Sequence, residues 1–132
     1  MPESNEVLDY NSPSVALLRH WLSKSLSLRI LDVPEPPGLL SSLDIRVAIL
    51  FSGGLDCTVL VRLAHELLPP GQGMDLINVA FENPRQVALL ASRSNPPEGG
   101  IYEACPDRIT GRKAFAELKA ACPGRLLRFI AV

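Results

Sequence analysis

The sequence predicts an α/β fold, an incomplete Rossmann-like parallel sheet of about three strands with flanking helices. A continuous apolar run rich in strand-forming residues occurs at 47–51, and mostly apolar segments of the same kind occur at 76–81 and 126–132. Apolar residues at helical spacing occupy 57–68 and 111–122, between those runs. This alternation is typical of parallel sheets. A sheet of this size has unpaired edges, so we expect a protein partner that completes it.

The residues before the sheet predict a helix and a connector. Residues 1–12 are polar, and we expect a flexible N-terminus there. Ser12 and Pro13 predict the cap and first turn of a helix that reaches about Leu28 and packs beside the sheet. Within 13–45, the prolines at 34–38 exclude a helix and predict an extended connector to the first strand.

The most informative segment is the loop that follows the first strand. Two glycines without Cβ atoms can adopt positive φ and bring backbone N–H groups close to an anion. The helix that starts near Cys57 adds unpaired N–H groups and a partial positive charge at the same point. The sequence therefore predicts a phosphate site made by Ser52, Gly53, Gly54, Leu55, Asp56 and Cys57.

Asp56 indicates how the anion is bound. A carboxylate beside phosphate oxygens repels them by about a few kcal/mol, whereas a divalent cation between them reverses the sign. Mg²⁺ is usually held by one or two carboxylates together with phosphate oxygens. We therefore expect ATP as its magnesium complex, with Asp56 as the metal ligand. The alternative is a plain strand–turn–helix junction in which Asp56 caps the helix.

Cys57 occupies a position where a hydroxyl would be a better donor to phosphate. A thiol donates weakly, so we expect phosphate binding of reduced strength, carried by the backbone N–H. The alternative is a nucleophile whose pKa is lowered by the helix N-terminus. No pattern ties His20 or His65 to Cys57, so this alternative is the weaker one.

The rest of the chain predicts a second and a third helix around an insertion. In the helix at 57–68, Arg62 and Glu66 are spaced i,i+4, and His65 is expected to be solvated. Residues 82–105 have mixed polarity and proline breaks, which predict a mobile insertion. Thr110 is expected to cap the helix at 111–122.

Composition and cysteine spacing exclude several classes of function. The formal net charge is -1 and no basic cluster is interleaved with aromatic residues, which argues against nucleic-acid binding. Cys57, Cys105 and Cys122 lack a Cys-x-x-Cys spacing, so Cys105 and Cys122 are expected to have no chemistry. The N-terminus lacks a secretory pattern and no apolar run is long enough to span a membrane. We expect a cytoplasmic protein that does not bind membranes.

The loop resembles Ser-Gly-Gly-x-Asp-Ser, the pyrophosphate loop of the ATP pyrophosphatases, with Cys57 at the last position. With the segments at 33–37, 48–54, 76–81 and 106–112, the chain resembles the asparagine synthetase family over about residues 14–132. The run Asp-Arg-Ile-Thr-Gly-Arg at 107–112 is similar to one divergent branch of that family. The resemblance implies that 46–132 is the N-terminal part of an ATP pyrophosphatase domain.

The resemblance also implies a reaction. The β-carboxylate of aspartate attacks the α-phosphate of ATP, pyrophosphate leaves, and ammonia displaces AMP to give asparagine. The loop would hold the pyrophosphate, and the strand ends at Leu50, Val79 and Phe81 would hold the adenosine. Pro2 stands where the family's glutaminase has its cysteine, so we expect no ammonia from glutamine. The family's later strands do not follow, so we expect ATP binding without the complete reaction.

The sequence leaves two alternatives to this function. The chain could be a non-catalytic remnant or interaction module with weak or no nucleotide binding, which Cys57 favours. Transfer RNA thiolation by relatives with the same loop would need paired cysteines, which are absent from the sequence. Arg108, Arg112 and Lys113 stay open between phosphate-facing cations and surface pairs with Asp107 or Glu103 that contribute under about 1 kcal/mol each.

Overall fold

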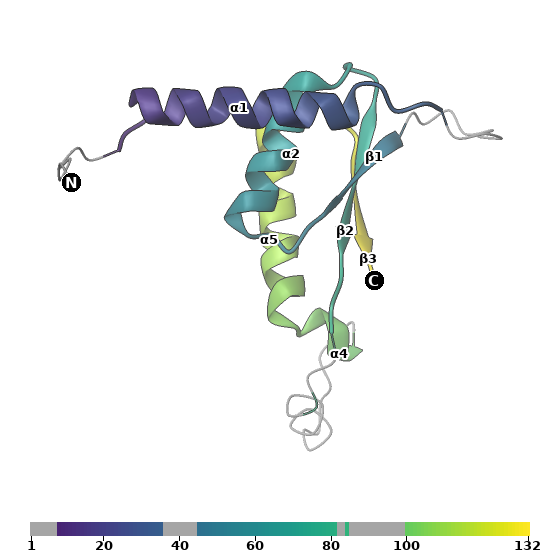
Figure 1. Ribbon diagram of the computed structural model, residues 1–132. Helices are drawn as coiled ribbons and strands as arrows, with labels where there is room; N and C mark the ends of the chain where they lie inside the picture. The colour runs from purple at the N-terminus through teal and green to yellow at the C-terminus, as the bar shows by residue number, and fades with distance from the viewer. Residues whose placement is uncertain (1–7, 36–44, 82–83, 85–99) are drawn as a thin grey trace.

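The computed structural model describes residues 8–35, 45–81, 84 and 100–132. The predicted alternation of strands and helices is confirmed (Figure 1). The helices are α1 (Pro13–Ile30), α2 (Leu55–Leu67), α4 (Gly100–Glu103) and α5 (Pro106–Ala121), and the strands are β1 (Ile45–Leu50), β2 (Gly73–Asn78) and β3 (Leu127–Ala131). The predicted flexible N-terminus and mobile insertion fall largely outside the described residues.

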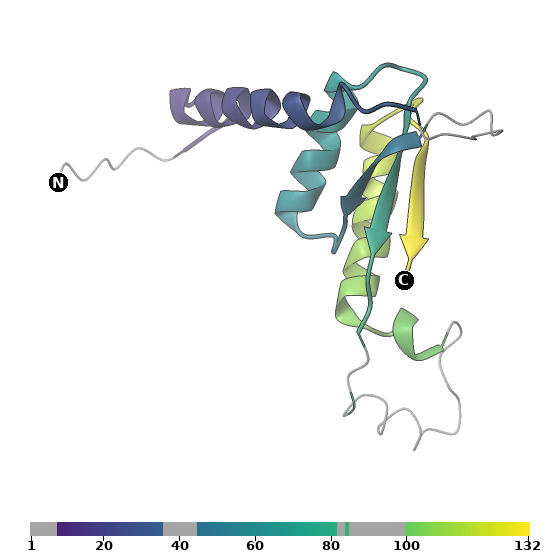
Figure 2. The ribbon, with the colours of Figure 1, turned by 45° about the vertical axis from the view of Figure 1, so that its right-hand side comes forward.

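The three strands form one parallel sheet in the order β1-β2-β3. Helices α2 and α5 lie side by side on one face of the sheet, and all three strands end at the same edge (Figures 1 and 2). Ligands of open α/β sheets bind outside the carboxyl ends of the strands. A ligand site is therefore expected at this edge of the sheet.

The core lies between the sheet and the helix pair. Alternate residues of β2 point to the helices, and Met74, Leu76 and Asn78 are fully buried. The helices contribute Val61 and Ala64 of α2 to the same cluster, which continues through Ala114, Leu118 and Leu127.

The other face of the sheet carries no helix among the described residues. Leu50, Ile77 and Ile130 stand in one row across it, because Leu50 pairs with Ile77 and Ile77 with Ile130. Leu50 is 75% exposed. The partner that would complete the sheet stays a prediction, and the uncovered row explains why the strands read as apolar on both faces.

Helix α1 does not pack beside the sheet as expected. It packs against α2, where Arg19 forms an ion pair with Glu66 at 2.8 Å, and its first turns extend past the body of the molecule (Figure 1). Trp21 in the middle of α1 is 54% exposed. Ser12 is the N-cap as predicted, but its hydroxyl donates to Asp9 rather than capping the helix.

Two element boundaries differ from the expected ones for identifiable reasons. Strand β2 begins at Gly73, because Gly73 pairs with Ile45 at the start of β1. The backbone is so close there that a Cβ would lie 2.9 Å from the Ile45 side chain. Helix α5 begins at Pro106, with Cys105 as its N-cap. Proline is favoured at the first helical position, so Thr110 lies inside the helix instead of capping it.

The far end of α2 is closed by a side chain from the loop before β3. The guanidinium of Arg125 donates to the carbonyl oxygens of His65 and Leu68 at 2.8 and 2.9 Å, and to those of Pro69 and Gln72. Its Nε donates to Nδ1 of His65 at 3.2 Å. His65 is therefore a half-buried partner of Arg125, and the expected solvated histidine was wrong. None of the helices in the described ranges combines the length and apolar character needed to cross a membrane.

Candidate phosphate-binding site

The loop between β1 and α2 requires glycine at its first glycine position. Gly53 has a φ of +85°, which L side chains rarely adopt. A Cβ on Gly53 would also lie 2.6 Å from backbone atoms of Thr110 and Gly111. The loop therefore packs directly on the first turns of α5, which fixes its position at the carboxyl edge of the sheet.

Gly54 has a different role from the one expected. Its φ of -69° and ψ of 169° are accessible to any residue, and it is the N-cap of α2. A Cβ there would contact only the hydroxyl of Ser52, at 3.5 Å. Positive φ is thus confirmed for Gly53 and wrong for Gly54, whose small size leaves the approach to the helix N-terminus open.

The N-terminus of α2 presents free backbone donors. Helix α2 begins at Leu55, and its first backbone hydrogen bond joins the Thr58 N–H to the carbonyl of Gly54 at 3.2 Å. The N–H groups of Leu55, Asp56 and Cys57 precede that bond and have no acceptor among the described residues. Free N–H groups at a helix N-terminus form an anion site when a ligand can approach them.

Ser52 and Cys57 flank these donors. The Cys57 thiol donates to the Gly54 carbonyl at 3.2 Å, and its sulfur lies 3.8 Å from the Ser52 hydroxyl. The thiol proton is therefore used inside the loop, and Cys57 offers an anion its backbone N–H alone. The Ser52 hydroxyl lies 3.4 Å from the Gly54 N–H, a long contact that leaves the hydroxyl free to donate to a phosphate oxygen.

Asp56 lies in the first turn of α2, exposed, with no hydrogen bond or ion pair to a described residue. A free carboxylate beside free N–H donors fits Mg²⁺, which takes oxygen ligands from one or two carboxylates and from phosphates. Among residues 8–35, 45–81, 84 and 100–132, no three His, Cys, Asp or Glu side chains converge on a metal position. A cation at Asp56 would thus be completed by the ligand's own oxygens and by water.

Asn78 belongs to this edge and was missed in the sequence. It ends β2, is fully buried, and its amide nitrogen donates to the carbonyl of Phe51 at 2.8 Å and to that of Asp107 at 3.1 Å. One side chain thereby ties the ends of β1 and β2 to the first turn of α5. A polar residue in a mostly apolar segment could have indicated the end of the strand. The expected strand extended to Phe81, so Asn78 was placed inside it instead of at its end.

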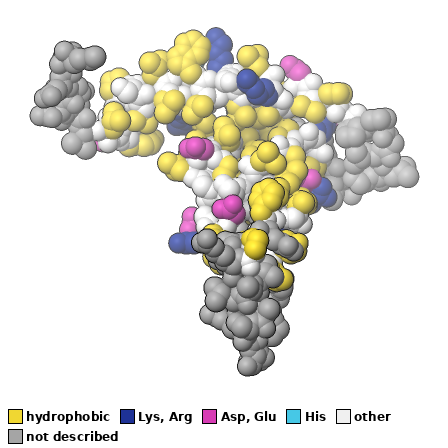
Figure 3. Space-filling model, turned by 60° about the horizontal axis from the view of Figure 1, so that its bottom comes forward, with side chains coloured by type: hydrophobic (Ala, Val, Ile, Leu, Met, Phe, Trp, Pro, Cys, Tyr) yellow, Lys and Arg dark blue, Asp and Glu magenta, His cyan; other side chains and the backbone are white. Residues whose placement is uncertain are grey.

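The residues expected to hold an adenosine lie at the same edge. Leu50 and Phe81 are 75% and 77% exposed, and Val79 is half-buried. Because β2 ends at Asn78, Val79 and Phe81 follow the strand instead of ending it. The space-filling view from this side shows hydrophobic side chains gathered over the edge (Figure 3). These residues provide apolar surface that an aromatic base could contact.

The arginines of α5 differ from one another. Arg112 forms a bidentate pair with Glu103 at 2.9 and 3.1 Å, which confirms the surface-pair interpretation for that residue. The hydrogen bond from Arg112 lowers the pKa of Glu103. Lys113 is exposed. Arg108 is only 2% exposed, so the expected surface pair was wrong for it.

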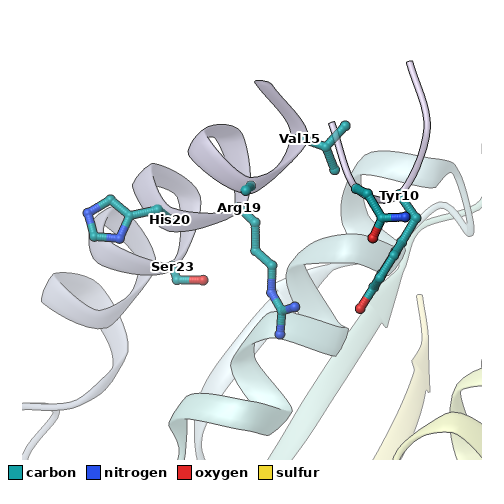
Figure 4. A pocket seen from close by; sticks show the side chains of 7 residues that line it. Tyr10, Val15, Arg19, His20 and Ser23 are labelled. Atoms are coloured by element: carbon teal, nitrogen blue, oxygen red, sulfur yellow. The ribbon is translucent and has the colours of Figure 1, made fainter. Parts of the chain in front are cut away.

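A cavity of about 540 Å³ lies elsewhere, beside α1 at the end where the strands begin (Figure 4). Its walls are Tyr10, Asn11, Val15, Ala16, Arg19, His20 and Ser23. Arg19 is occupied by Glu66, and His20 lies on exposed helix surface. The cavity shares no residue with the loop, and its lining gives no reason to assign chemistry to it.

Comparison with known proteins gives relatives of one kind. The chain is 37% identical over 87 residues, 66% of its length and 14% of the relative, to asparagine synthetase domain-containing protein CG17486 of Drosophila melanogaster. It is 30% identical to asparagine synthetase domain-containing protein 1 of Bos taurus and of Homo sapiens, over 84% of the chain and 22% of each relative. It therefore spans about a fifth of the length of these relatives. No family model and no solved structure matches.

Proposed function

Because this chain belongs to the family of asparagine synthetase domain-containing proteins, we propose that its loop binds ATP as the magnesium complex and holds the β- and γ-phosphates. One observation carries the proposal: the N–H groups of Leu55, Asp56 and Cys57 and the carboxylate of Asp56 are free together at the end of β1. The N–H groups supply the phosphate donors, and Asp56 supplies the ligand to the cation that screens it from them.

The reaction follows from what such a loop stabilises. A carboxylate oxygen of aspartate forms a bond to the α-phosphorus, and the bond from that phosphorus to the β-bridging oxygen breaks. The leaving pyrophosphate takes the electron pair and two phosphate groups, and fixed N–H donors at those groups stabilise the charge that develops on them. Ser52 and the free N–H groups of α2 would contact the leaving pyrophosphate, and Asp56 would hold the cation bound to it.

Binding calorimetry with magnesium ATP tests the phosphate site. The proposal expects ATP and pyrophosphate to bind and AMP to bind much more weakly, because AMP lacks the groups that the loop holds. Asp56→Asn should weaken magnesium ATP by about tenfold or more and should leave magnesium-free pyrophosphate as tight or tighter, because the repelling charge is gone. AMP binding as tightly as ATP would contradict the assignment.

Adenylation is tested separately by exchange of labelled pyrophosphate into ATP. Exchange that depends on aspartate supports the proposed reaction. Magnesium ATP bound without any exchange would contradict adenylation and leave the nucleotide site intact.

A further inference from the structure

Arg108 is a buried cation that the fold does not fully use. Its side chain is 2% exposed, and only Nη2 has a hydrogen-bond acceptor, the carbonyl of Val132 at 2.8 Å. Nε and Nη1 are buried without a partner among the described residues. Only one of the five guanidinium N–H groups therefore has an acceptor in the described part of the chain, and four have none, although a buried charged group is normally hydrogen-bonded throughout.

The side-chain carboxylate beside Arg108 is hydrogen-bonded to another arginine. Oε1 of Glu103 lies 3.8 Å from Nε of Arg108, beyond hydrogen-bond distance, while Arg112 holds both oxygens of the same carboxylate. The two guanidinium groups also share one aromatic ring, since their Cζ atoms lie 5.9 and 4.6 Å from the Phe129 centroid. Among the described residues, two guanidinium groups thus share one side-chain carboxylate and one ring, so the positive charge of Arg108 is only partly paired.

This charge lies at the edge that carries the loop. Arg108 is the third residue of α5, and the next turn of α5 packs against Gly53. The neighbouring residue Asp107 is joined through Asn78 to the end of β1. The N-termini of α2 and α5 are therefore fixed to each other, with the Arg108 guanidinium beside the second of them.

We infer that Arg108 is an oxyanion-binding residue of this edge, which takes a carboxylate or phosphate group of a ligand on its Nε and Nη1 groups. The inference extends the proposed nucleotide site and rests on it for the source of the oxyanion. A guanidinium binds both kinds of oxyanion through paired N–H groups. The Glu103 carboxylate lies 3.8 Å from Arg108 without a hydrogen bond to it, and Glu103 is 32% exposed. A ligand oxyanion can therefore take the place of this carboxylate beside the Arg108 guanidinium.

The test follows the Nε–Hε signal of Arg108 in NMR spectra of the whole chain during titration. Magnesium pyrophosphate supplies the phosphate arm, and L-aspartate supplies the carboxylate arm. A saturable shift of this signal with either ligand supports the inference and identifies the source. Shifts of the loop amides alone overturn the role of Arg108 and leave the phosphate site. A shift at Arg108 without the loop amides separates it from that site, and no shift at either place overturns both.

Variants give a second measurement. Arg108→Met should weaken the ligand that shifts the signal by about tenfold or more, because a charge-assisted pair is lost. Glu103→Gln should increase the affinity for the same ligand, because the competing carboxylate is removed. If Glu103 only stabilised the fold, this variant would lower the free energy of unfolding and leave the affinity unchanged. Arg128→Met is the control, because Arg128 is bidentately paired with Asp75 at 2.7 and 2.8 Å on the uncovered face. Equal weakening by Arg108→Met and Arg128→Met would overturn the inference.

Discussion

Replacing Gly53 by alanine should destabilise the protein far more than replacing Gly54. At Gly53 the new Cβ meets a φ of +85° and backbone atoms of Thr110 and Gly111 at 2.6 Å, and no side-chain rotation can relieve a backbone contact. At Gly54 the φ is -69°, and the Cβ would meet only the Ser52 hydroxyl at 3.5 Å. The two adjacent glycines therefore form a matched pair.

The size of the effect follows from the two costs at Gly53. The left-handed conformation costs a non-glycine residue about 1–2 kcal/mol. Forcing extra volume into a packed contact costs about 1–3 kcal/mol. Gly53→Ala should thus lower the free energy of unfolding by about 2–5 kcal/mol, and Gly54→Ala by well under about 1 kcal/mol.

Urea unfolding followed by far-ultraviolet circular dichroism measures both variants. The slope of the free energy against urea should stay constant, so that the midpoint alone reports stability. Equal midpoints for the two variants would refute the packing of the loop on α5, and with it the position of the phosphate site relative to Arg108.

Three further predictions concern other contacts. Arg125→Met should lower the free energy of unfolding by about 2–4 kcal/mol, because four carbonyl acceptors at the end of α2 lose a charged donor. Arg128→Met removes an exposed arginine and should lower the free energy of unfolding much less. Equal urea midpoints for the two variants would contradict this prediction. Burial and the charge of Arg125 lower the pKa of His65 from 6.5, so on acidification the unfolded chain binds the proton first. The free energy of unfolding should therefore fall as pH falls through 6.5. Urea midpoints at several pH values should show this dependence, and it should be weaker in His65→Gln. Cys57→Ser should leave the affinity for magnesium ATP within about twofold, because the side chain at 57 donates to the Gly54 carbonyl and offers phosphate only its backbone N–H; a tightening of about tenfold in calorimetry would contradict this and show that the side chain faces phosphate.

The order of the elements could be predicted because each strand is a mostly apolar segment and the two helices between the strands have apolar residues at helical spacing. What escaped were the features set by contacts distant in sequence. The expected strand began at residue 76, and only the pairing of Gly73 with Ile45 shows that β2 starts three residues earlier. The packing of α1 on α2 likewise depends on contacts distant in sequence, the Arg19–Glu66 pair and the burial of Ile30 in the core, which the pattern of α1 itself does not reveal.

The site was predictable to the extent that it consists of consecutive residues. Ser52, Gly53 and Asp56 could be identified from the loop, because a strand, small residues and a helix N-terminus follow one another directly. Asn78 could not, since its role depends on the ends of other elements that it contacts. For Arg108 the sequence left a phosphate-facing cation and a surface pair open, and only its burial in the fold excludes the surface pair. The role of Gly54 was misjudged because sequence does not distinguish a glycine that needs positive φ from one that needs only small size.

The most direct test of the phosphate site is the response of the backbone amides at 53–57 to magnesium pyrophosphate in ¹H–¹⁵N spectra. We expect the largest shifts at the free N–H groups of Leu55, Asp56 and Cys57, saturating with a single affinity and depending on Mg²⁺. Amides that stay unchanged while shifts appear only beside α1 would contradict the site and the function proposed from it.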